Sequence, residues 1–348
     1  MRNPRAFRIE NLIRSRYSDQ EYLVITSRFA NEKNINEKNI YRLGISRNIQ
    51  SLRRQQLKKY FLLRFLHRLI WPDDKILYNI WSLIYYILFL RKRDDHIYTV
   101  SNPFSSHFIG YFLKRFLKHV WTIDVGDLFY LPDQSASYFK KCNLYFERKV
   151  TSTCDHLLVN ADSMRAYFAD KYKLDRNKIQ VIPNGNRLDF PKMNRSKSKT
   201  LQLTFIGNTY ESLRDGLAEI DIFLRLYNEH PELNMNIQLL GMMYQPLLQK
   251  INACQTWIQT SVCNSDEKLL EAYAKTDILL NFANKNYPGI PSKLEEYIAS
   301  GIPVIHFCWQ ANDPGSIFLK QSNHPFLEFV IGQTPVLELK IYLDKFKD

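Results

Sequence analysis

Residues 287–306 read YPGIPSKLEEYIASGIPVIH, and this stretch decides the fold that we expect for the chain. It begins with a turn rich in proline and glycine and continues into a short helix predicted over residues 293–300. Gly301 ends this helix, and Pro303 begins a buried strand. Residues 277–281 read as another buried strand upstream. Strands and helices that alternate in this way are typical of an α/β domain built on a parallel sheet.

The turn at the start of the predicted helix has the geometry that binds phosphate. Free backbone N–H groups and the positive end of the helix dipole meet there, and Lys293 adds a cation. Glu296 lies about one turn further on, where a carboxylate can accept hydrogen bonds from ribose hydroxyls. The stretch therefore predicts an anion or nucleotide site. The alternative is an ordinary αβ unit in which Lys293 and Glu296 are solvated.

Residues 289–305, GIPSKLEEYIASGIPVI, resemble the nucleotide-sugar motif of the group 1 glycosyltransferases with the GT-B fold. Two further segments resemble that family in the same order, residues 154–160, CDHLLVN, and residues 178–185, KIQVIPNG. The resemblance extends over residues 98–307. The chain departs from the wider family at Pro288, where that family has the first of two glutamates eight positions apart. The donor-sugar contact of that glutamate is therefore missing or supplied from elsewhere.

The resemblance implies an α/β protein with the GT-B fold, in which two Rossmann-like, doubly wound domains face each other across a cleft. We expect residues 1–196 to form an acceptor-binding domain and residues 197–348 a nucleotide-sugar-binding domain. The length of the chain is sufficient for two domains of ordinary size.

Three segments are expected near the junction of the two domains. Asn184 and Gly185 form a tight turn after the predicted strand 179–182, and we expect this turn to lie between the domains. Residues 191–200 are polar and basic without an apolar pattern, which is typical of a linker. The last predicted helix, residues 334–347, often crosses back to the first domain in proteins of this fold.

The donor site is expected at the end of strand 201–206 and at the start of helix 293–300. A glycine at the end of that strand lets a diphosphate or a sugar approach the backbone closely. Arg214 is the only basic residue between Gly207 and Arg225, so it is our candidate for binding the diphosphate. The expected donor-binding residues are Gly207, Asn208, Arg214, Gly289, Ile290, Pro291, Ser292, Lys293 and Glu296.

Three residues are expected to act on the acceptor or on the leaving group. His107 follows the predicted strand 95–100, where it can bind a sugar hydroxyl or a phosphate, and the alternative is a structural histidine. Asp127 follows strand 120–125 and suits an acceptor hydroxyl, and the alternative is a turn or cap residue. Together with Lys293 beside the leaving diphosphate, they make up the expected catalytic set.

Charge is unevenly distributed along the chain. Residues 1–195 hold 35 Lys and Arg against 18 Asp and Glu, a net charge of +17, whereas residues 196–348 hold 13 against 17, a net charge of −4. A basic first half favours anionic lipid, nucleic acid or an acidic acceptor as a partner. Residues 48–71 read as a basic amphipathic helix that suits an anionic membrane, or as a helix with a core face and a solvated basic face. Residues 80–90 are uncharged but too short to span a bilayer, and they read as a buried helix, with an interfacial role as the alternative.

Several classes of protein are disfavoured. The loop after the predicted strand 21–27 contains no G-x-G, so NAD chemistry is not expected. Five scattered cysteines without metal-ligand spacing fit a reducing compartment, and the N-terminus lacks the apolar core of a standard signal peptide. We expect no catalytic metal, because the motif region contains no D-x-D, and no cofactor besides the nucleotide-sugar co-substrate.

The expected function is transfer of a sugar from a nucleotide-diphosphate donor to a polysaccharide or lipid-linked glycan, as in capsule or lipopolysaccharide biosynthesis. The resemblance implies retention of anomeric configuration and a cytoplasmic, peripheral location at the inner face of a bacterial membrane. Two enzymatic alternatives share the fold, an inverting glucuronosyltransferase-like enzyme and a nucleotide-sugar epimerase. The non-enzymatic alternative is a basic nucleic-acid-binding protein, but the sequence contains no RRM, KH or helix-turn-helix signature, so we expect no nucleic-acid partner.

Overall fold

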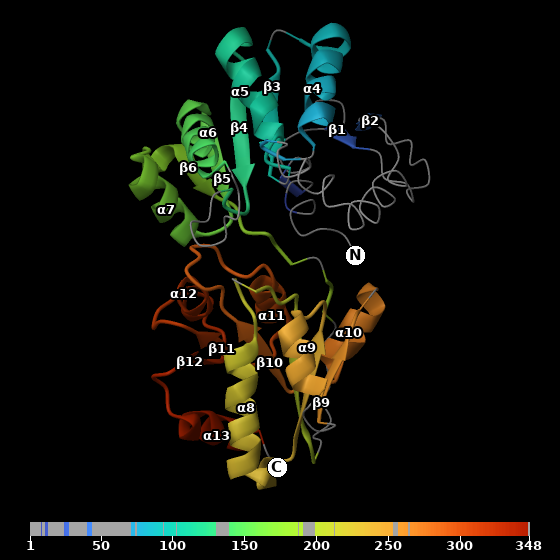
Figure 1. Ribbon diagram of the computed structural model, residues 1–348, viewed down its shortest axis with the longest axis vertical. Helices are drawn as coiled ribbons and strands as arrows, with labels where there is room; N and C mark the ends of the chain where they lie inside the picture. Colours follow the sequence, from blue (N-terminus) through green and yellow to red (C-terminus); the bar gives the residue numbers. More distant parts are fainter. Residues whose placement is uncertain are drawn as a thin grey trace. The chain divides into compact units, whose positions relative to one another are not determined.

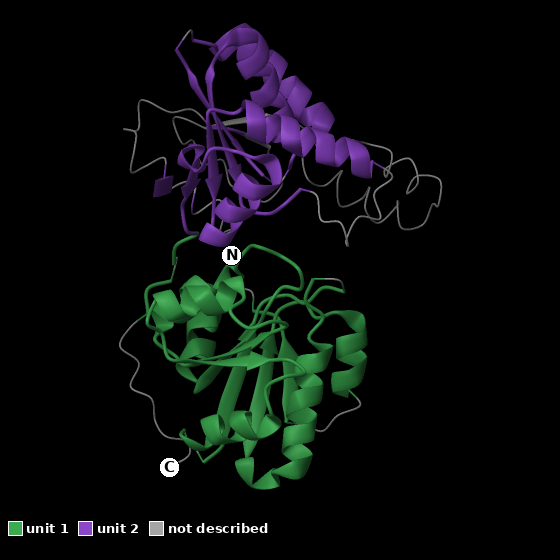
Figure 2. Cartoon of the chain, turned by 90° about the vertical axis from the view of Figure 1, so that its left-hand side faces the viewer, with its two compact units in different colours: residues 1–7, 184–348 green, residues 8–183 purple. Residues whose placement is uncertain are grey.

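The computed structural model describes most of the chain as two compact units (Figure 2). The described residues are 8, 11–12, 24–27, 40–43, 71–73, 75–92, 94–101, 103–129, 139–186, 188–190, 199–211, 213–252, 257–263 and 265–346. We call residues 8–183 the N-terminal unit and residues 184–348 the C-terminal unit. Each unit has its own parallel sheet with helices packed against it.

The C-terminal unit is built on a six-stranded parallel sheet with the strand order β12-β11-β10-β7-β8-β9 (Figure 1). Its strands are β7 (Leu201–Ile206), β8 (Met235–Leu240), β9 (Ile258–Ser261), β10 (Ile278–Phe282), β11 (Val304–Cys308) and β12 (Phe326–Val330). The chain proceeds outward from β7 to β9 and then returns to β10 on the other side of β7. The strand order therefore reverses between β7 and β10. In open α/β sheets, ligands bind at the carboxyl ends of the strands at such a point.

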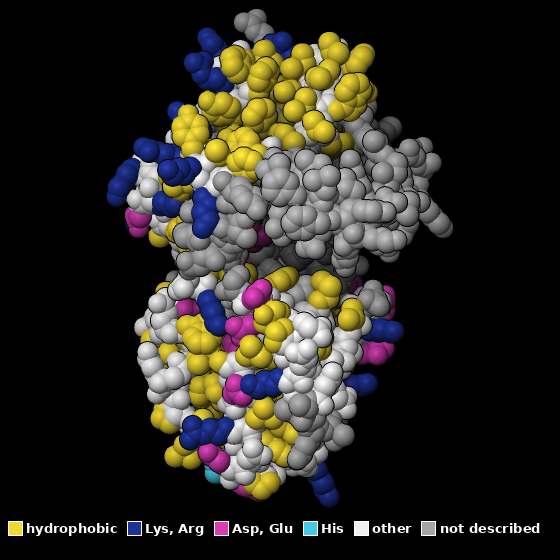
Figure 3. Space-filling view, in the orientation of Figure 1, with side chains coloured by type: hydrophobic (Ala, Val, Ile, Leu, Met, Phe, Trp, Pro, Cys, Tyr) yellow, Lys and Arg dark blue, Asp and Glu magenta, His cyan; other side chains and the backbone are white. Residues whose placement is uncertain are grey.

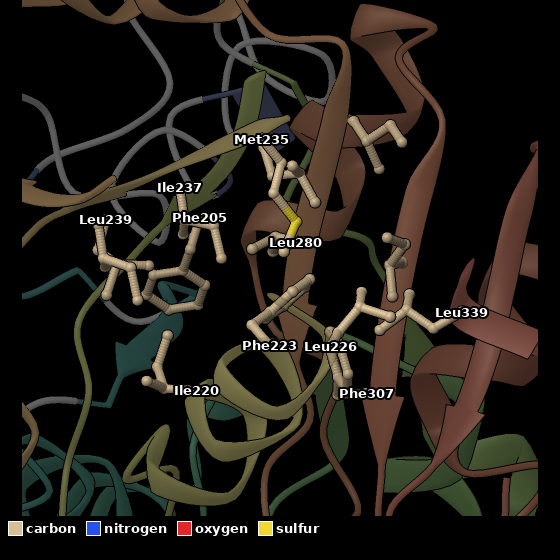
Figure 4. Packing of buried hydrophobic residues seen from close by; sticks show 14 of the residues in the cluster. Phe205, Ile220, Phe223, Leu226, Met235, Ile237, Leu239, Leu280, Phe307 and Leu339 are labelled. Carbon is tan, nitrogen blue, oxygen red and sulfur yellow. The ribbon is translucent and has the colours of Figure 1, made fainter. Parts of the chain in front are cut away.

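Helices cover both faces of this sheet, because its strands carry buried apolar side chains on both sides. Against one face pack α8 (Leu217–Glu229), α9 (Gln245–Asn252) and α13 (Val336–Asp344), with the short turn η3 (Pro231–Leu233) after α8. Against the other face pack α10 (Asp266–Ala274), α11 (Lys293–Ser300) and α12 (Pro314–Gln321). Figure 4 shows part of the first core, where Phe223 of α8 lies among Phe205, Leu280 and Phe307 of the sheet.

The N-terminal unit contains a four-stranded parallel sheet with the order β3-β4-β5-β6 and a separate two-stranded pair, β1-β2. The strands are β1 (Val24–Ser27), β2 (Ile40–Leu43), β3 (His96–Val100), β4 (Val120–Val125), β5 (His156–Val159) and β6 (Ile179–Val181). The helices are α4 (Ile76–Tyr85), the π-helical turn η1 (Tyr86–Leu90), α5 (Ser106–Leu117), α6 (Lys140–Thr153), α7 (Asp162–Tyr172) and the short turn η2 (Arg176–Lys178). Helix α5 packs closely on β4, since a Cβ atom at Gly110 would lie 2.0 Å from Nε1 of Trp121.

The expected architecture of two Rossmann-like α/β units is confirmed. The strands predicted over residues 120–125 and 201–206 and the helix predicted over residues 293–300 have those bounds in the structure. The predicted helix 48–71 lies almost wholly outside the described residues, as do residues 191–198 of the predicted linker.

Two segments near the predicted domain junction take part in the C-terminal unit. Leu188 and Phe190 pack in its core, and α13 packs against β12 and α8 of the same unit. Within the described ranges, no helix is long and apolar enough to cross a membrane.

Candidate functional site

The carboxyl ends of β7 and β10 are joined to α11 by the side chain of Tyr297. This tyrosine is fully buried, and its hydroxyl accepts a hydrogen bond of 2.9 Å from the backbone N–H of Ile206. The same hydroxyl lies 3.3 Å from the carbonyl oxygens of Ile206 and Leu280 and can donate to either. Burial raises the pKa of Tyr297, so the hydroxyl keeps its proton for this bond. Helix α11 is thereby fixed beside the point where the strand order reverses.

The loop after β7 packs closely against the loop after β8 and is hydrogen-bonded to it. A Cβ atom at Gly241 would lie 2.0 Å from the carbonyl oxygen of Gly207, so the two loops approach as closely as glycine permits. The side-chain oxygen of Asn208 accepts a hydrogen bond from the N–H of Met242 at 2.9 Å, and the N–H of Thr209 donates to the carbonyl of Met242 at 3.0 Å. Gly207 and Asn208, both expected to bind the donor, therefore lie in a rigid loop at the carboxyl edge of the sheet.

Arg214 directs its guanidinium back toward this edge. Nη1 donates a hydrogen bond of 3.4 Å to the carbonyl of Phe282 at the end of β10, and the guanidinium carbon lies 5.7 Å from the ring centroid of Phe205. Nη2 is 3.9 Å from the position that a Cβ atom would take at Gly207. Burial lowers the pKa of Arg214, and its Nε has no hydrogen-bond partner among the described residues. A partly desolvated cation with a spare donor is suited to an anionic ligand.

Acidic and basic side chains surround the start of α8 next to Arg214. Lys285, after β10, forms an ion pair of 2.8 Å with Asp215, and its ammonium lies 4.2 Å from the ring centroid of Trp309. Glu219 is 2% exposed, and burial raises the pKa of its carboxyl to about 7, with the nearby charge of Asp215 acting in the same direction. Sequence reasoning did not single out Glu219, because a carboxylate in the first turn of a helix is usually solvated.

The start of α11 contains the remaining predicted donor residues. Ile290 and Pro291 are buried, and the carbonyl of Pro291 accepts a hydrogen bond of 3.0 Å from the N–H of Leu294, which begins the helix. Lys293 forms an ion pair of 2.7 Å with Oε2 of Glu296. The buried Gly289 and the half-buried Ser292 precede this pair in the turn.

Glu296 is anchored inside the C-terminal unit. Its side chain is 4% exposed, whereas that of Lys293 is 19% exposed. The hydroxyl of Tyr273 donates to Oε2 of Glu296 at 3.3 Å. One carboxylate oxygen thus holds both the lysine and the tyrosine, which fixes the pair at the helix N-terminus.

Asn184 and Gly185, expected between the domains, are bound to α11. The carboxylate of Glu295 accepts hydrogen bonds from both of their backbone N–H groups, and the bond to Asn184 measures 2.8 Å. Glu295 is buried, so its charge is balanced by these two dipoles. The sequence offered no signal for this role, since Glu295 and Glu296 are adjacent and chemically identical.

His107 is the centre of a buried hydrogen-bond network in the N-terminal unit. The Ser101 hydroxyl donates to the carbonyl of Asp124 at 3.0 Å, so the Nε2–H of His107 must donate to Ser101, 3.0 Å away. Nδ1 then accepts from the hydroxyl of Thr99 at 2.7 Å, and this hydroxyl accepts from Nε1 of Trp121 at 2.9 Å. Burial lowers the pKa of His107 to about 3. Both ring nitrogens are engaged and the ring is neutral, which is the structural alternative for this histidine; a catalytic role remains a prediction.

Two aspartates near the end of β4 have different environments. Asp124 is buried and pairs with Arg8, whose Nη1 also donates to the carbonyl of Ile182 at 3.2 Å. Asp127 is exposed two residues after β4. An exposed carboxylate at the carboxyl end of a parallel strand is accessible from solvent, and a role of Asp127 toward an acceptor hydroxyl stays a prediction.

One group of potential metal ligands lies within the described residues, formed by His306, Cys308 and Asp313, whose ligand atoms lie within 4.8 Å of one another. Nε2 of His306 is 2.8 Å from Asp313, and its Nδ1 is 2.6 Å from the side-chain nitrogen of Asn281. Burial raises the pKa of the Cys308 thiol to about 12, and the nearby charges of Asp313 and Glu328 act in the same direction. Asp313 also accepts from the N–H of Ser316 at the start of α12. This cluster therefore stabilises the strand–helix junction.

Comparison with known proteins gives a family match over part of the chain and one fold. Residues 43–190 match the model of Glycosyltransferase Family 4. A search of curated proteins finds no match to this sequence. Among solved structures, OtsA in its apo form covers 99% of this chain and 91% of its own, with a TM-score of 0.59 and 13% identity.

Two other solved structures share the fold over most of this chain. Sucrose-phosphate synthase from Thermosynechococcus elongatus has a TM-score of 0.58 and 16% identity, over 79% of this chain and 70% of its own. The pneumococcal O-GlcNAc transferase GtfA, in complex with UDP and GlcNAc, has a TM-score of 0.53 and 14% identity, over 77% of this chain and 52% of its own. The chain thus spans about half the length of GtfA. Residues 43–190 thus match the Family 4 model, and the shared architecture over most of the chain shows the GT-B fold.

Proposed function

We propose that the chain transfers a sugar from a nucleoside-diphosphate donor to a polysaccharide or a lipid-linked glycan. The observation that carries this proposal is the arrangement at the carboxyl ends of β7 and β10. The strand order reverses between these two strands, and the segments that follow them contain three features of the site. These are the close-packed loop at Gly207, the guanidinium of Arg214 and the N-terminus of α11. Such an edge offers backbone N–H groups and cations to a phosphate.

Each residue of this edge has a proposed role toward the donor. Arg214 and Lys293 bind the diphosphate, and Glu296 accepts hydrogen bonds from the ribose hydroxyls. Lys293 and Glu296 hold each other in position before the donor arrives, since they form an ion pair of 2.7 Å. As the sugar leaves, negative charge grows on the diphosphate, and the two cations and the helix N-terminus stabilise it.

The acceptor is proposed to meet the N-terminal unit. Asp127 is exposed at the carboxyl end of β4, and it is our candidate for binding the attacking hydroxyl. We assign His107, on α5, the supporting role of holding α5, β3 and β4 together beneath that edge, because it bonds Thr99 and Ser101, which in turn bond Trp121 and Asp124 of β4. We further propose retention of anomeric configuration, a cytoplasmic location at the inner face of a bacterial membrane and a task in capsule or lipopolysaccharide biosynthesis.

The test is a reaction of the purified protein with UDP-, GDP- and ADP-sugars, with and without glycan acceptors. Product analysis by NMR should detect a glycoside whose formation requires the acceptor, with the anomeric configuration of the donor. A donor that is epimerised in the absence of acceptor would instead indicate an epimerase. Thermal stabilisation by RNA, but by none of the nucleotides, would contradict the proposal and favour the nucleic-acid-binding alternative.

A further inference from the structure

The helix formed by α4 and η1 turns an apolar face to solvent. Residues 76–90 contain no charged side chain, yet six large apolar residues of this segment are exposed. These residues are Leu77, Ile80, Trp81, Ile84, Leu88 and Phe89. Leu77, Leu88 and Phe89 are the most exposed, at 74%, 66% and 69%. The sequence had favoured a buried helix here, and the structure shows instead that only one face is buried.

The buried face of α4 and η1 is mixed, because Leu83 and Tyr86 pack in an apolar cluster with Leu113 of α5 while polar residues are buried beside them. Asn79 is buried and its side-chain nitrogen donates to the hydroxyl of Ser105 at 2.6 Å. Ser82 is also buried and donates to the carbonyl of Tyr78 at 3.0 Å. A helix that covers a core normally has polar residues on its outer face, in water, whereas the outer face of this helix is apolar. Among the described residues of the N-terminal unit, packing accounts for the inward face and leaves the outward apolar side chains exposed.

The exposed apolar surface continues from α4 onto the end of α5. Phe116 is 64% exposed there, next to Arg115. Figure 3 shows hydrophobic side chains gathered over α4 and α5, with Lys and Arg side chains near their edges. We call the six α4–η1 residues together with Phe116 the apolar patch. A contiguous surface of this kind is typical of an interaction site.

Basic side chains follow the helix ends that border the apolar patch. Arg91 and Lys92, directly after η1, and Arg115 and Lys118, at the end of α5, are all exposed. Residues 75–118 contain seven Lys and Arg against two Asp. The surface thus combines an apolar centre with a basic border. A complementary partner should therefore present an apolar region together with negative charge.

We propose that the apolar patch docks on the surface of an anionic lipid bilayer, with α4 and η1 lying in the interface. Leucine, isoleucine and phenylalanine side chains would enter the acyl boundary, tryptophan would lie at headgroup level, and the basic border would contact lipid phosphates. A second copy of the chain is a poorer partner, because a symmetric contact would place two basic borders against each other. The residues of the apolar patch are not those of the 48–71 segment that the sequence favoured, and the proposal does not depend on the donor site.

Vesicle binding by the full-length chain tests the proposal. The wild type should sediment with phosphatidylglycerol vesicles at low salt and be released at high salt, and it should bind phosphatidylcholine vesicles at least tenfold more weakly. Leu88→Ser with Phe89→Ser should lower vesicle affinity at least about tenfold, since each side chain is expected to leave water on binding. The matched control is Leu337→Ser with Ile341→Ser on α13, which are 57% and 53% exposed in the other unit and should bind vesicles as the wild type does.

Tryptophan fluorescence locates the contact. Brominated acyl chains should quench Trp81 on vesicle binding, and Trp81→Phe should abolish most of that quenching. Arg91→Gln with Lys92→Gln should weaken binding to anionic vesicles several-fold and leave the residual binding to neutral vesicles unchanged.

Two results would overturn the proposal. One is equal vesicle affinity of the wild type and the Leu88→Ser, Phe89→Ser variant. The other is a dimer in sedimentation velocity that this variant dissociates, because the face would then bind a second copy. Donor binding in solution serves as a separate readout, so failure of the membrane proposal and failure of the proposed function remain distinguishable.

Discussion

Replacing Tyr297 by phenylalanine perturbs the contact that fixes α11 at the reversal point of the sheet. The hydroxyl accepts from the N–H of Ile206 at 2.9 Å and can donate to Ile206 or Leu280, both carbonyls at 3.3 Å. Leu280 is the last residue of β10 that pairs with β7. The Tyr297 hydroxyl therefore accepts from the N–H of Ile206 just beyond the end of this strand pairing. Phenylalanine keeps the buried ring and removes this group alone.

The expected cost follows from the groups left behind. The Ile206 N–H loses its side-chain acceptor inside a fully buried region, and an unsatisfied buried donor costs about 1–3 kcal/mol. No large cavity forms, because a single oxygen atom is removed. The free energy of unfolding of the C-terminal unit should therefore fall by about 1–3 kcal/mol.

Urea denaturation and hydrogen exchange of peptides that contain β7 measure this effect. The midpoint should fall with an unchanged m-value, and the amide of Ile206 should exchange faster. Tyr342→Phe on α13 is the matched control, because no hydrogen bond of that hydroxyl is found among the described residues, and it should cost less than about 0.5 kcal/mol. Equal losses in the two variants would refute the reasoning.

Three further predictions follow from the same unit. The carboxyl of Glu219 binds a proton more tightly in the folded chain, with a pKa of about 7, so its contribution to stability is present at low pH and is lost as pH rises through about 7. In denaturation curves, the free energy of unfolding of the wild type should therefore fall by about 3 kcal/mol more than that of Glu219→Gln between pH 4.5 and 8. Lys293→Ala should lower kcat more than donor affinity, because charge on the diphosphate grows in the transition state; a pure rise in KM in steady-state kinetics would contradict this. Glu295→Ala should destabilise the unit by about 2–5 kcal/mol in the same denaturation assay, because the backbone N–H groups of Asn184 and Gly185 both lose their acceptor. A loss of about half that size would indicate that only one of the two hydrogen bonds contributes.

The sequence predicted the sheet and the helices of the C-terminal unit well, because their signals are local. Buried parallel strands read as short apolar runs, as in residues 201–206, and Gly301 ends α11 as expected. The turn at Gly289 and the basic residue at the start of α11 likewise predicted a phosphate site from spacing alone, and that site stays a prediction. These predictions needed no knowledge of which segments meet in space.

The properties that depend on packing were beyond the sequence. Spacing could not distinguish Glu295, which binds the turn at Asn184, from Glu296, which pairs with Lys293. The apolar run of α4 looked like a core helix, because hydrophobicity does not reveal which face has a neighbour. The burial of His107 was equally hidden, since its partners Thr99, in β3, and Ser101, directly after β3, are ordinary residues until β3 and α5 pack together.

Isothermal titration with nucleoside diphosphates tests the donor site most directly. One of UDP, GDP and ADP should bind the wild type with a stoichiometry of one. Glu296→Gln should weaken that binding by about 1.5–3 kcal/mol, because a charge-assisted hydrogen bond is lost, and Arg214→Gln should weaken it by a similar amount. Glu338→Gln, at an exposed glutamate in the first turn of α13, is the matched control and should bind as the wild type does. Wild-type affinity in folded Glu296→Gln and Arg214→Gln variants would contradict a donor site at the carboxyl ends of β7 and β10.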